Sequence, residues 1–210
     1  MTVVDIHVQH EKMLPIIRER LAEFAAVNQE DWFYEFCYCL LTPQSKAANA
    51  GEVVTLLREL EFKETGSSPL HLLVSPKHYI RFHNVKSRRL QLLQQQWPEV
   101  EHFLLEHNER NTKNPRLVRD ELASRVNGYG LKEASHVLRN IGWREIAILD
   151  RHILRCLVQL SVLKSIPLLN SIRSYHEVER QMILFSQTIN IDVDELDLVF
   201  WSMFTGKILK

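Results

Sequence analysis

The feature that most constrains the fold is the helical spacing of apolar residues along nearly the whole chain. Met13, Ile17, Leu21 and Phe24 recur at intervals of three or four, which places them on one face of a helix. Strand-like alternation is nearly absent, and Trp32–Leu41 is apolar nearly all round, which indicates a buried central helix. The pattern predicts an all-α globular protein.

The remaining helices are predicted from the same periodicity and from the polar residues, prolines and glycines between them. Their expected ranges are 45–60, 69–73, 78–95, 98–106, 115–124, 132–140, 151–160, 175–188 and 193–204. We expect Ser45 to cap the first of these, Gly142 to end the helix 132–140, and Pro15 to lie in the first turn of the helix before Trp32.

The composition is that of an ordinary globular protein, with 45% hydrophobic and 25% charged residues. Because the net charge is zero, composition alone does not indicate a nucleic-acid binder. The stretch from Pro76 to Arg89 nevertheless contains no acid, and its cations are Lys77, Arg81, Lys86, Arg88 and Arg89. This run is either a basic face for an anionic partner or an ordinary solvated helix face.

The three cysteines predict neither a disulfide framework nor a metal site. Their number is odd, and Cys37 and Cys39 are too close in sequence for a zinc pair, so we interpret both, and Cys156, as small buried residues. No secretory leader opens the chain, and no segment approaches the ~20 apolar residues of a membrane span. We expect a soluble, cytoplasmic protein without membrane contact.

Two short motifs carry the chemistry. The first, Val126-Asn127-Gly128-Tyr129-Gly130-Leu131-Lys132-Glu133-Ala134, is typical of a glycine hairpin that opens a helix. Gly128 and Gly130 leave backbone N–H groups exposed at the helix N-terminus, where a phosphate can bind. A glycine hairpin before a helix is common, so this motif alone is a weak signal of DNA binding.

The second motif, Leu149-Asp150-Arg151-His152-Ile153, places a carboxylate at the start of the next helix. Lys132 falls in the first turn of the hairpin helix, and an amine is a nucleophile only when neutral. Asp150 can accept its proton and can stabilise positive charge on a sugar ring. The alternative is an ordinary lysine–aspartate salt bridge. The pair predicts attack on a sugar carbon whose phosphate backbone is held by the hairpin.

On these residues the chain resembles the helix-hairpin-helix glycosylase superfamily, and within it the archaeal-type (type 2) 8-oxoguanine DNA glycosylase/AP lyases. Leu41-Thr42-Pro43-Gln44-Ser45 and the C-terminal Trp201 with Thr205-Gly206-Lys207-Ile208-Leu209-Lys210 match as well, so the resemblance spans nearly the whole chain. It implies two helical domains with the active-site cleft between them. Residues 29–136 would form the central domain that ends in the hairpin, and 1–28 with 137–210 the second.

The resemblance also implies roles for the paired residues. Lys132 would attack C1′ of the damaged nucleotide, with Asp150 as its activating carboxylate, and β-elimination from the Schiff base would nick the strand on the 3′ side. The base must first leave the stack. Gln44 occupies the position of a residue inserted into the duplex, although in isolation it is an ordinary surface glutamine at a helix start.

The same resemblance implies a damaged-base pocket. Trp201 would stack on the base and Phe82 on its opposite face, although core packing explains either residue alone. Lys210, with its carboxylate, would contact the oxidised guanine, where composition indicates only a frayed tail. 8-Oxoguanine carries a proton at N7, which a backbone carbonyl near Pro43 or Gln44 would accept.

Cofactors and partners follow from the resemblance too. Endonuclease III-like relatives carry four C-terminal cysteines for an iron–sulfur cluster, whereas only Cys156 lies beyond the hairpin here, so we expect no cluster and no required cofactor. A Na⁺ or K⁺ ion held by hairpin carbonyls would fit the superfamily. The expected partner is double-stranded DNA containing 8-oxoguanine, bound by a monomer associated with the nucleoid.

The main interpretation is a base-excision-repair enzyme for 8-oxoguanine, and two other functions stay open. One is the same machinery acting on oxidised pyrimidines. The other is a non-catalytic helix-hairpin-helix module that only binds DNA. The pair Lys132 and Asp150 separates an enzyme from a binding module, because a module that only binds DNA does not need it.

Overall fold

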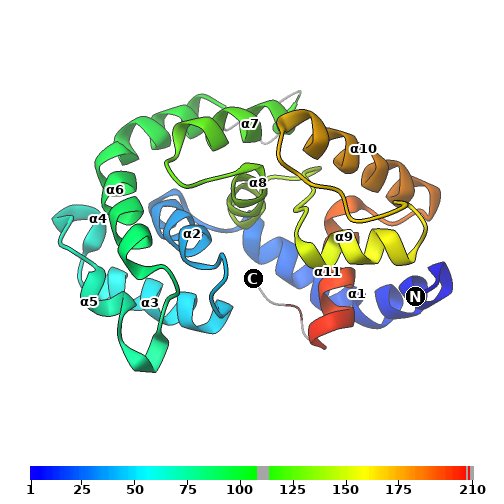
Figure 1. The fold of residues 1–210 in the computed structure, drawn as a ribbon, viewed down its shortest axis with the longest axis horizontal. Coiled ribbons are helices and arrows are strands. Elements are labelled where there is room, and N and C mark those ends of the chain that lie inside the picture. Colours follow the sequence, from blue (N-terminus) through cyan, green and yellow to red (C-terminus); the bar gives the residue numbers. More distant parts are fainter. Residues whose placement is uncertain (108–113, 207, 209–210) are drawn as a thin grey trace. The chain divides into compact units, whose positions relative to one another are not determined.

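The structure, a computed structural model, describes residues 1–107, 114–206 and 208 of the 210-residue chain, and Figure 1 shows its helices. The elements are α1 (Val3–Ala25), α2 (Gln29–Leu41), α3 (Ala47–Glu59), α4 (Phe62–Thr65), α5 (Leu70–Leu73), the 3-10 helix η1 (Pro76–His78), α6 (His83–Glu106), α7 (Pro115–Arg125), α8 (Leu131–Asn140), α9 (Arg151–Gln159), α10 (Ile172–Thr188) and α11 (Val193–Thr205). The residues described contain no strand, as the sequence predicts. They also contain no helix long and apolar enough to cross a membrane.

The chain forms two compact units. Unit 1 comprises Met1–Ala26 and Leu138–Lys210, and unit 2 comprises Val27–Val137. The second boundary therefore falls inside α8. The division expected from the sequence has its boundaries after residues 28 and 136.

Unit 2 is built around α2, which packs against α3 and α6. Every residue from Trp32 to Leu41 is buried, so the predicted central buried helix is confirmed. Phe33 and Phe36 are fully buried, and the Trp97 ring from α6 meets both edge-on, with centroids 5.3 and 5.2 Å away. Burial of large rings in this geometry is among the strongest stabilising contributions available to a small core.

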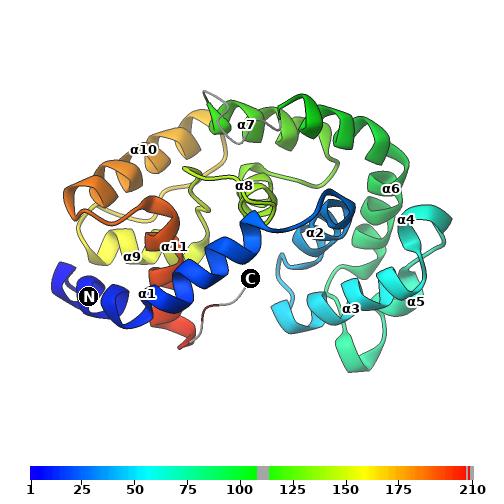
Figure 2. The same cartoon turned by 180° about the vertical axis from the view of Figure 1, so that it is seen from behind.

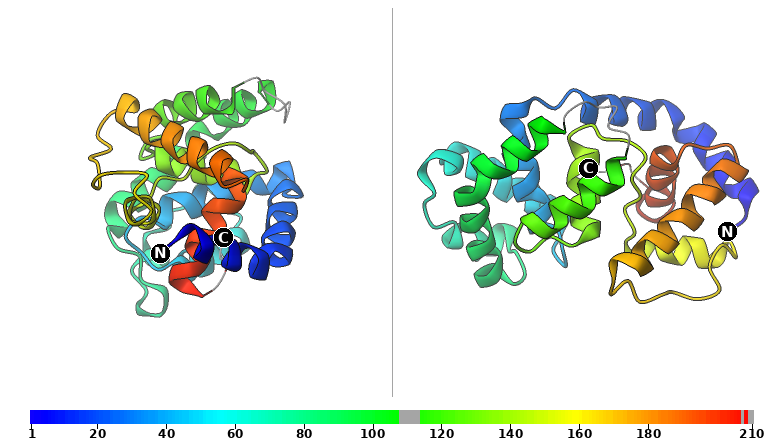
Figure 3. Two further views of the ribbon diagram at one scale, coloured as in Figure 1. Left: turned by 90° about the vertical axis from the view of Figure 1, so that its right-hand side faces the viewer. Right: turned by 90° about the horizontal axis from the view of Figure 1, so that it is seen from above.

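Unit 1 is built around α11, which packs against α1, α9 and α10 (Figures 2 and 3). A buried ion pair joins α11 to the end of α8, since Arg139 Nη1 lies 2.6 Å from Asp197 Oδ2. Burial raises the pKa of the Asp197 carboxyl, and the Arg139 guanidinium opposes that rise. The guanidinium also lies 5.0 Å from the ring centroid of Phe24 on α1.

The first helix begins much earlier than predicted. α1 starts at Val3, where Thr2 and Asp5 form a reciprocal capping box. Pro15 therefore lies inside the helix and not in its first turn. Ile6, fully buried on the same face as Ile17, shows that core packing extends through the N-terminal half of α1.

The break predicted before Pro98 is also wrong. A single helix, α6, runs from His83 to Glu106 with Pro98 inside it. Its buried stripe continues without interruption from Leu90 through Trp97 to Leu104. A proline in a helix interior costs about 3 kcal/mol, and burying this stripe outweighs that cost. The residues 78–82 expected at the start of this helix instead belong to η1 and a turn.

The stretch Ile146–Leu149 between α8 and α9 is buried without regular secondary structure. Its backbone is satisfied by side chains, as buried polar groups require. Ala147 N donates to Glu179 Oε1 at 3.1 Å, and Leu149 N to the Tyr175 hydroxyl at 3.2 Å, while that hydroxyl donates to Ala147 O at 2.9 Å. These bonds from α10 fix the chain that leads into Asp150.

All three cysteines are buried and lie outside any disulfide, as expected from the sequence. Burial raises the pKa of the Cys37 thiol and that of the Cys156 thiol. Both thiols are therefore held in the protonated form.

Gly142 is predicted to be essential for the end of α8. Its φ is +94°, Gly142 N donates to Arg139 O, Trp143 N donates to Leu138 O, and an added Cβ would lie 2.9 Å from Ala25 Cα. Gly142→Ala should lower the free energy of unfolding by about 1–3 kcal/mol, measured by urea denaturation.

Gly51→Ala is the matched control. Gly51 lies within α3, and a Cβ there would meet nothing within 4 Å. Alanine should raise the free energy of unfolding by about 0.5–1 kcal/mol. Equal shifts of the same sign in the two variants would contradict the role given to Gly142.

Candidate active site

The hairpin between α7 and α8 is held by its own backbone. Tyr129 N donates to Val126 O at 3.1 Å, and Ala134 N donates to Gly130 O at 3.0 Å, which starts α8. Gly128 has φ +93°, and a Cβ there would overlap the Arg89 side chain from α6. Glycine at position 128 is therefore required both by the backbone torsion and by the close approach of Arg89.

Tyr129 anchors the hairpin on the core of unit 2. Its ring stacks on Phe36 of α2, with centroids 5.6 Å apart and planes 9° from parallel, and its hydroxyl donates to Phe36 O at 3.0 Å. The hydroxyl is buried, which raises its pKa well above the ordinary value. Arg119 of α7 is also fully buried and donates to Ser135 of α8 at 3.4 Å. The two helices of the motif are thus joined to each other and to α2.

Lys132 lies in the first turn of α8 with 29% of its side chain exposed. Its Nζ is 3.2 Å from Oε1 of Glu133, whose Oε2 accepts from Gly130 N, also at 3.2 Å. The Glu133 carboxylate therefore binds both the lysine and one of the two glycine N–H groups expected to hold a phosphate. Its position three residues after Gly130 is that of the reach-back glutamate of a capping box, a signal present in the sequence.

Asp150 is the N-cap of α9. Its Oδ1 accepts from His152 N at 2.7 Å and from Ile153 N at 2.9 Å. Both bonds go to the same oxygen, so they fix the orientation of the carboxylate. The N-terminus of a helix also favours a negative charge. Lys132 belongs to unit 2 and Asp150 to unit 1.

Trp201 lies close to the Asp150 motif within unit 1. Its ring centroid is 5.4 Å from that of His152, and the Phe204 ring is 5.3 Å from the same histidine. Trp201 is only partly buried and Phe204 is 43% exposed, so these rings are not part of the closed core. His152 and Phe204 are neighbours of the expected pocket that sequence reasoning missed.

Pro43 and Gln44 lie in the turn between α2 and α3. Gln44 is exposed and has φ +56°, in the left-handed region. The predicted capping role of Ser45 is wrong, because α3 begins at Ala47 with no side-chain cap. The Ser45 hydroxyl instead accepts from Arg81 N at 3.1 Å and from Lys86 Nζ at 3.1 Å.

The basic run divides into a solvated part and one buried lysine. Lys77, Arg81 and Arg88 are exposed, whereas Lys86 is 3% exposed. Lys86 falls four residues before Leu90 on the buried stripe of α6, so its burial could be expected from the periodicity.

Phe82 precedes α6 with φ +61° and is 49% exposed. The core-packing alternative for Phe82 is therefore wrong. The Arg81 guanidinium lies 5.0 Å from its ring centroid. The prediction for Lys210 falls outside the described residues.

A glycine hairpin that opens a helix with a lysine in its first turn, followed by a helix-capping aspartate, is the arrangement expected of a helix-hairpin-helix DNA glycosylase. Comparison with known proteins narrows the class. Residues 17–191 match the sequence profile of a family described as 8-oxoguanine DNA glycosylase. This match covers well over half of the chain. The chain belongs to the 8-oxoguanine DNA glycosylase family.

Individual relatives agree with this assignment. An 8-oxoguanine DNA glycosylase/AP lyase of Fusobacterium nucleatum is 34% identical over 96% of this chain and 94% of its own length. The crystal structure of the Methanocaldococcus jannaschii 8-oxoguanine DNA glycosylase matches with a TM-score of 0.84 and 28% identity over 99% of this chain and 96% of that one. The structure of the M. jannaschii glycosylase/lyase in complex with 15mer DNA containing 8-oxoguanine matches with a TM-score of 0.82 and 28% identity. That match covers 96% of this chain and 98% of the other. The predicted family and fold class are confirmed.

Asp150 is predicted to have a structural role separable from its charge. Asp150→Ala removes the acceptor of two backbone N–H groups and should lower the free energy of unfolding by about 0.5–2 kcal/mol. Asp150→Asn keeps an oxygen acceptor, so its loss of unfolding free energy should be only a few tenths of the loss in Asp150→Ala. Urea denaturation at neutral pH measures both, and an Asn variant as unstable as the Ala variant would contradict this role.

Proposed function

We propose that the protein is a base-excision-repair enzyme that removes 8-oxoguanine from duplex DNA and then nicks the strand at the abasic site. The enzyme class predicted from the sequence, a DNA glycosylase with AP lyase activity, is confirmed by the names of the relatives. The observation that carries the proposal is the position of Lys132, part-exposed in the first turn of the helix that follows the glycine hairpin.

Lys132 is the nucleophile in this proposal. Its neutral amine attacks C1′, the C1′–N9 bond breaks, and the electron pair leaves with the base. Loss of the amine proton and opening of the sugar ring give the imine, and removal of a C2′ proton expels the 3′ phosphate by β-elimination. Asp150 accepts the proton from the amine and stabilises positive charge on the sugar. Lys132 pairs with Glu133 in the structure, so the lysine must leave that contact before it attacks C1′.

The damaged base is proposed to lie against Trp201, with Phe82 and the C-terminal Lys210 as further contacts. The partial exposure of Trp201 and the 49% exposure of Phe82 support stacking on a ligand better than core packing. The N7 proton of 8-oxoguanine would be accepted by a backbone carbonyl of the Pro43–Gln44 turn. Pro43 O already accepts from Lys86 Nζ at 2.6 Å, so the lesion would share that oxygen or use the neighbouring one.

We propose that the partner is double-stranded DNA containing 8-oxoguanine and that a monomer binds it. The M. jannaschii relative was solved in complex with a 15mer DNA containing 8-oxoguanine, which supports this partner. Gly128 and Gly130 would hold a backbone phosphate, and Gln44 would enter the duplex. The Gly130 N–H becomes available to phosphate only when Glu133 releases it. We keep a Na⁺ or K⁺ ion at the hairpin carbonyls as part of the proposal, with no other cofactor.

Borohydride trapping tests the nucleophile. Wild-type protein mixed with a duplex containing 8-oxoguanine should form a covalent adduct. Lys132→Gln should reduce trapping at least about a hundredfold, because an amide cannot form the imine. Lys63→Gln is a matched control in unit 2, since Lys63 lies on α4 and pairs with Glu101 at 3.8 Å. Trapping of the Lys132 variant at the wild-type level would remove Lys132 from its role.

Deletion of Lys210 tests the base pocket. If the last residue contacts the oxidised guanine, excision of 8-oxoguanine should fall by about tenfold, the loss expected for one charged hydrogen bond. Cleavage at a preformed abasic site should change less, because no base is present there. Single-turnover nicking assays on the two duplexes measure both, and equal losses would contradict the pocket role of Lys210.

A further inference from the structure

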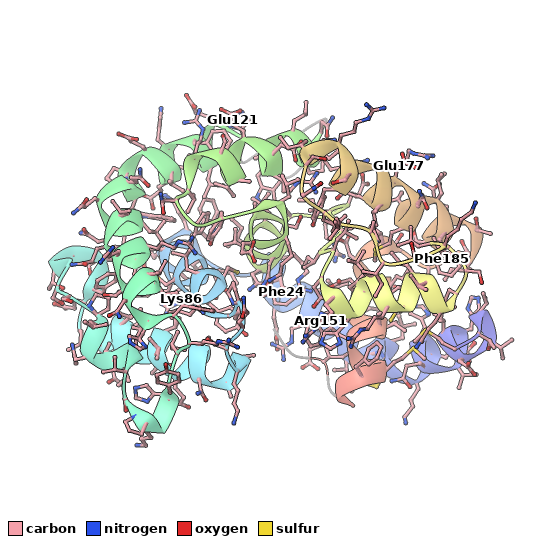
Figure 4. The ribbon with its side chains drawn as sticks, in the orientation of Figure 1. Phe24, Lys86, Glu121, Arg151, Glu177 and Phe185 are labelled. Carbon is pink, nitrogen blue, oxygen red and sulfur yellow. The ribbon has the colours of Figure 1, made fainter. Side chains whose placement is uncertain are left out.

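The Lys86 ammonium makes three hydrogen bonds, one to the end of α2 and two to the turn that follows it. It donates to Leu41 O at 2.7 Å, to Pro43 O at 2.6 Å and to the Ser45 hydroxyl at 3.1 Å. Lys86 is labelled on α6 in Figure 4, and only 3% of the residue is exposed. Two of its three acceptors flank Gln44 directly in the sequence. The ammonium thus holds the turn on both sides of Gln44.

The backbone of Gln44 needs such support. Its φ of +56° lies in the left-handed region, which residues with a Cβ adopt rarely. Strained torsions of this kind persist only where surrounding contacts hold them. Here the contacts are the turn's own bond from Ser45 N to Thr42 O at 3.0 Å, the bonds from Lys86, and the bond from Arg81 N to the Ser45 hydroxyl. The Gln44 residue itself is exposed, so the support fixes its backbone and leaves its side chain accessible.

Capping of α2 is the simpler role for Lys86. A lysine beside the last carbonyls of a helix interacts favourably with the helix dipole, and Leu41 is the last residue of α2. The bonds to Pro43 and Ser45 reach beyond the helix, however, and a cap does not account for them.

We propose that Lys86 is a positioning residue that holds the turn Thr42–Ser45 so that Gln44 is presented to the duplex in its left-handed conformation. This inference rests on the insertion role given to Gln44 in the proposed function. Lys86 makes no contact with the damaged nucleotide. Its loss impairs extrusion of the base and leaves the chemistry at Lys132 largely intact.

The charges around Lys86 set the pH range in which its three hydrogen bonds are present. Arg89 on α6 and Lys132 on α8 are the neighbouring cations, and Glu133 is the opposing anion. Burial, followed by Arg89 and Lys132, lowers the pKa of Lys86 from 10.5 to about 8. The three bonds are therefore present below about pH 8 and weaken above it. Because the pKa of Lys86 is lower in the folded protein than in the unfolded chain, the folded state becomes more stable as pH rises through this range. Unfolding is therefore not the cause of the weaker hydrogen bonds.

The first experiment compares two substrates. Lys86→Met keeps most of the length of the side chain and removes the charge. Excision of 8-oxoguanine in single-turnover assays should fall by about tenfold, as expected for loss of charged hydrogen bonds. Nicking of a preformed abasic site should change by less than about threefold, because there is no base to unstack. Lys63→Met, a part-buried lysine of the same unit, is the matched control and should leave both activities near wild type.

The second experiment is a double-mutant cycle with Gln44→Ala. If Lys86 acts through Gln44, then adding Lys86→Met to the Gln44→Ala protein should reduce excision by less than about twofold further. Two independent roles would instead multiply the two losses. This coupling would not arise from a general loss of stability, which lowers activity whether or not Gln44 is present.

The third readout is the pH profile. The ratio of wild-type to Lys86→Met excision should be highest near pH 6.5–7 and should fall as pH rises through about 8. A ratio that stays constant through pH 8 would contradict the pH range given for the charge on Lys86.

The outcomes separate this inference from the proposed function. Equal losses on both substrates, multiplicative losses with Gln44→Ala, or a fully active Lys86→Met protein would each overturn the role of Lys86. A wild-type protein that fails to excise 8-oxoguanine would overturn the proposed function itself. A fully active Gln44→Ala protein would remove the insertion role on which the inference rests.

Discussion

The burial of α2 is the constraint on which unit 2 depends. Three elements of the site are held by this helix. The hairpin contacts it through the stack of Tyr129 on Phe36, and α6 through the edge contacts of Trp97. The Gln44 turn is linked to it through Lys86, which also donates to Leu41 O at the end of α2. Because interiors are close-packed, a shift of any of these elements disturbs the others. The hairpin that carries Lys132, the proposed nucleophile, and the turn proposed to enter the duplex are therefore positioned by one buried helix.

Several charged side chains are buried, and each described here is held by polar partners. Lys86 binds three oxygens, Arg139 pairs with Asp197, and Arg119 donates to Asp120 at 2.7 Å. Such groups cost desolvation energy, and removing one partner is far more harmful than a surface substitution. Lys86 joins the turn after α2 to α6, Arg139 joins the end of α8 to α11, and Arg119 joins α7 to α8 through Ser135. Buried charge in this fold therefore adds specific links, between helices and to one turn, to the contacts made by apolar surface.

The sequence was sufficient for the fold class and for the two motifs, because helical periodicity and a glycine hairpin are local signals. It failed where tertiary packing outweighed a local preference. Pro98 continues a helix because the buried stripe from Leu90 to Leu104 runs through it. Serine is a residue type that often caps helices, yet the Ser45 hydroxyl accepts from Arg81 and Lys86, which are distant in sequence. The site roles of residues such as Gln44 came from the resemblance, since no spacing rule assigns insertion into a duplex.

The buried cysteines have a consequence for the conditions under which the enzyme works. 8-Oxoguanine arises when guanine is oxidised, so its repair is needed when oxidants are abundant. Oxidation of cysteine to sulfenic acid and beyond proceeds through the exposed thiolate. Cys37, Cys39 and Cys156 are each 0% exposed, and burial keeps the thiols of Cys37 and Cys156 protonated. The catalyst is thereby protected from the same oxidative chemistry that produces its substrate.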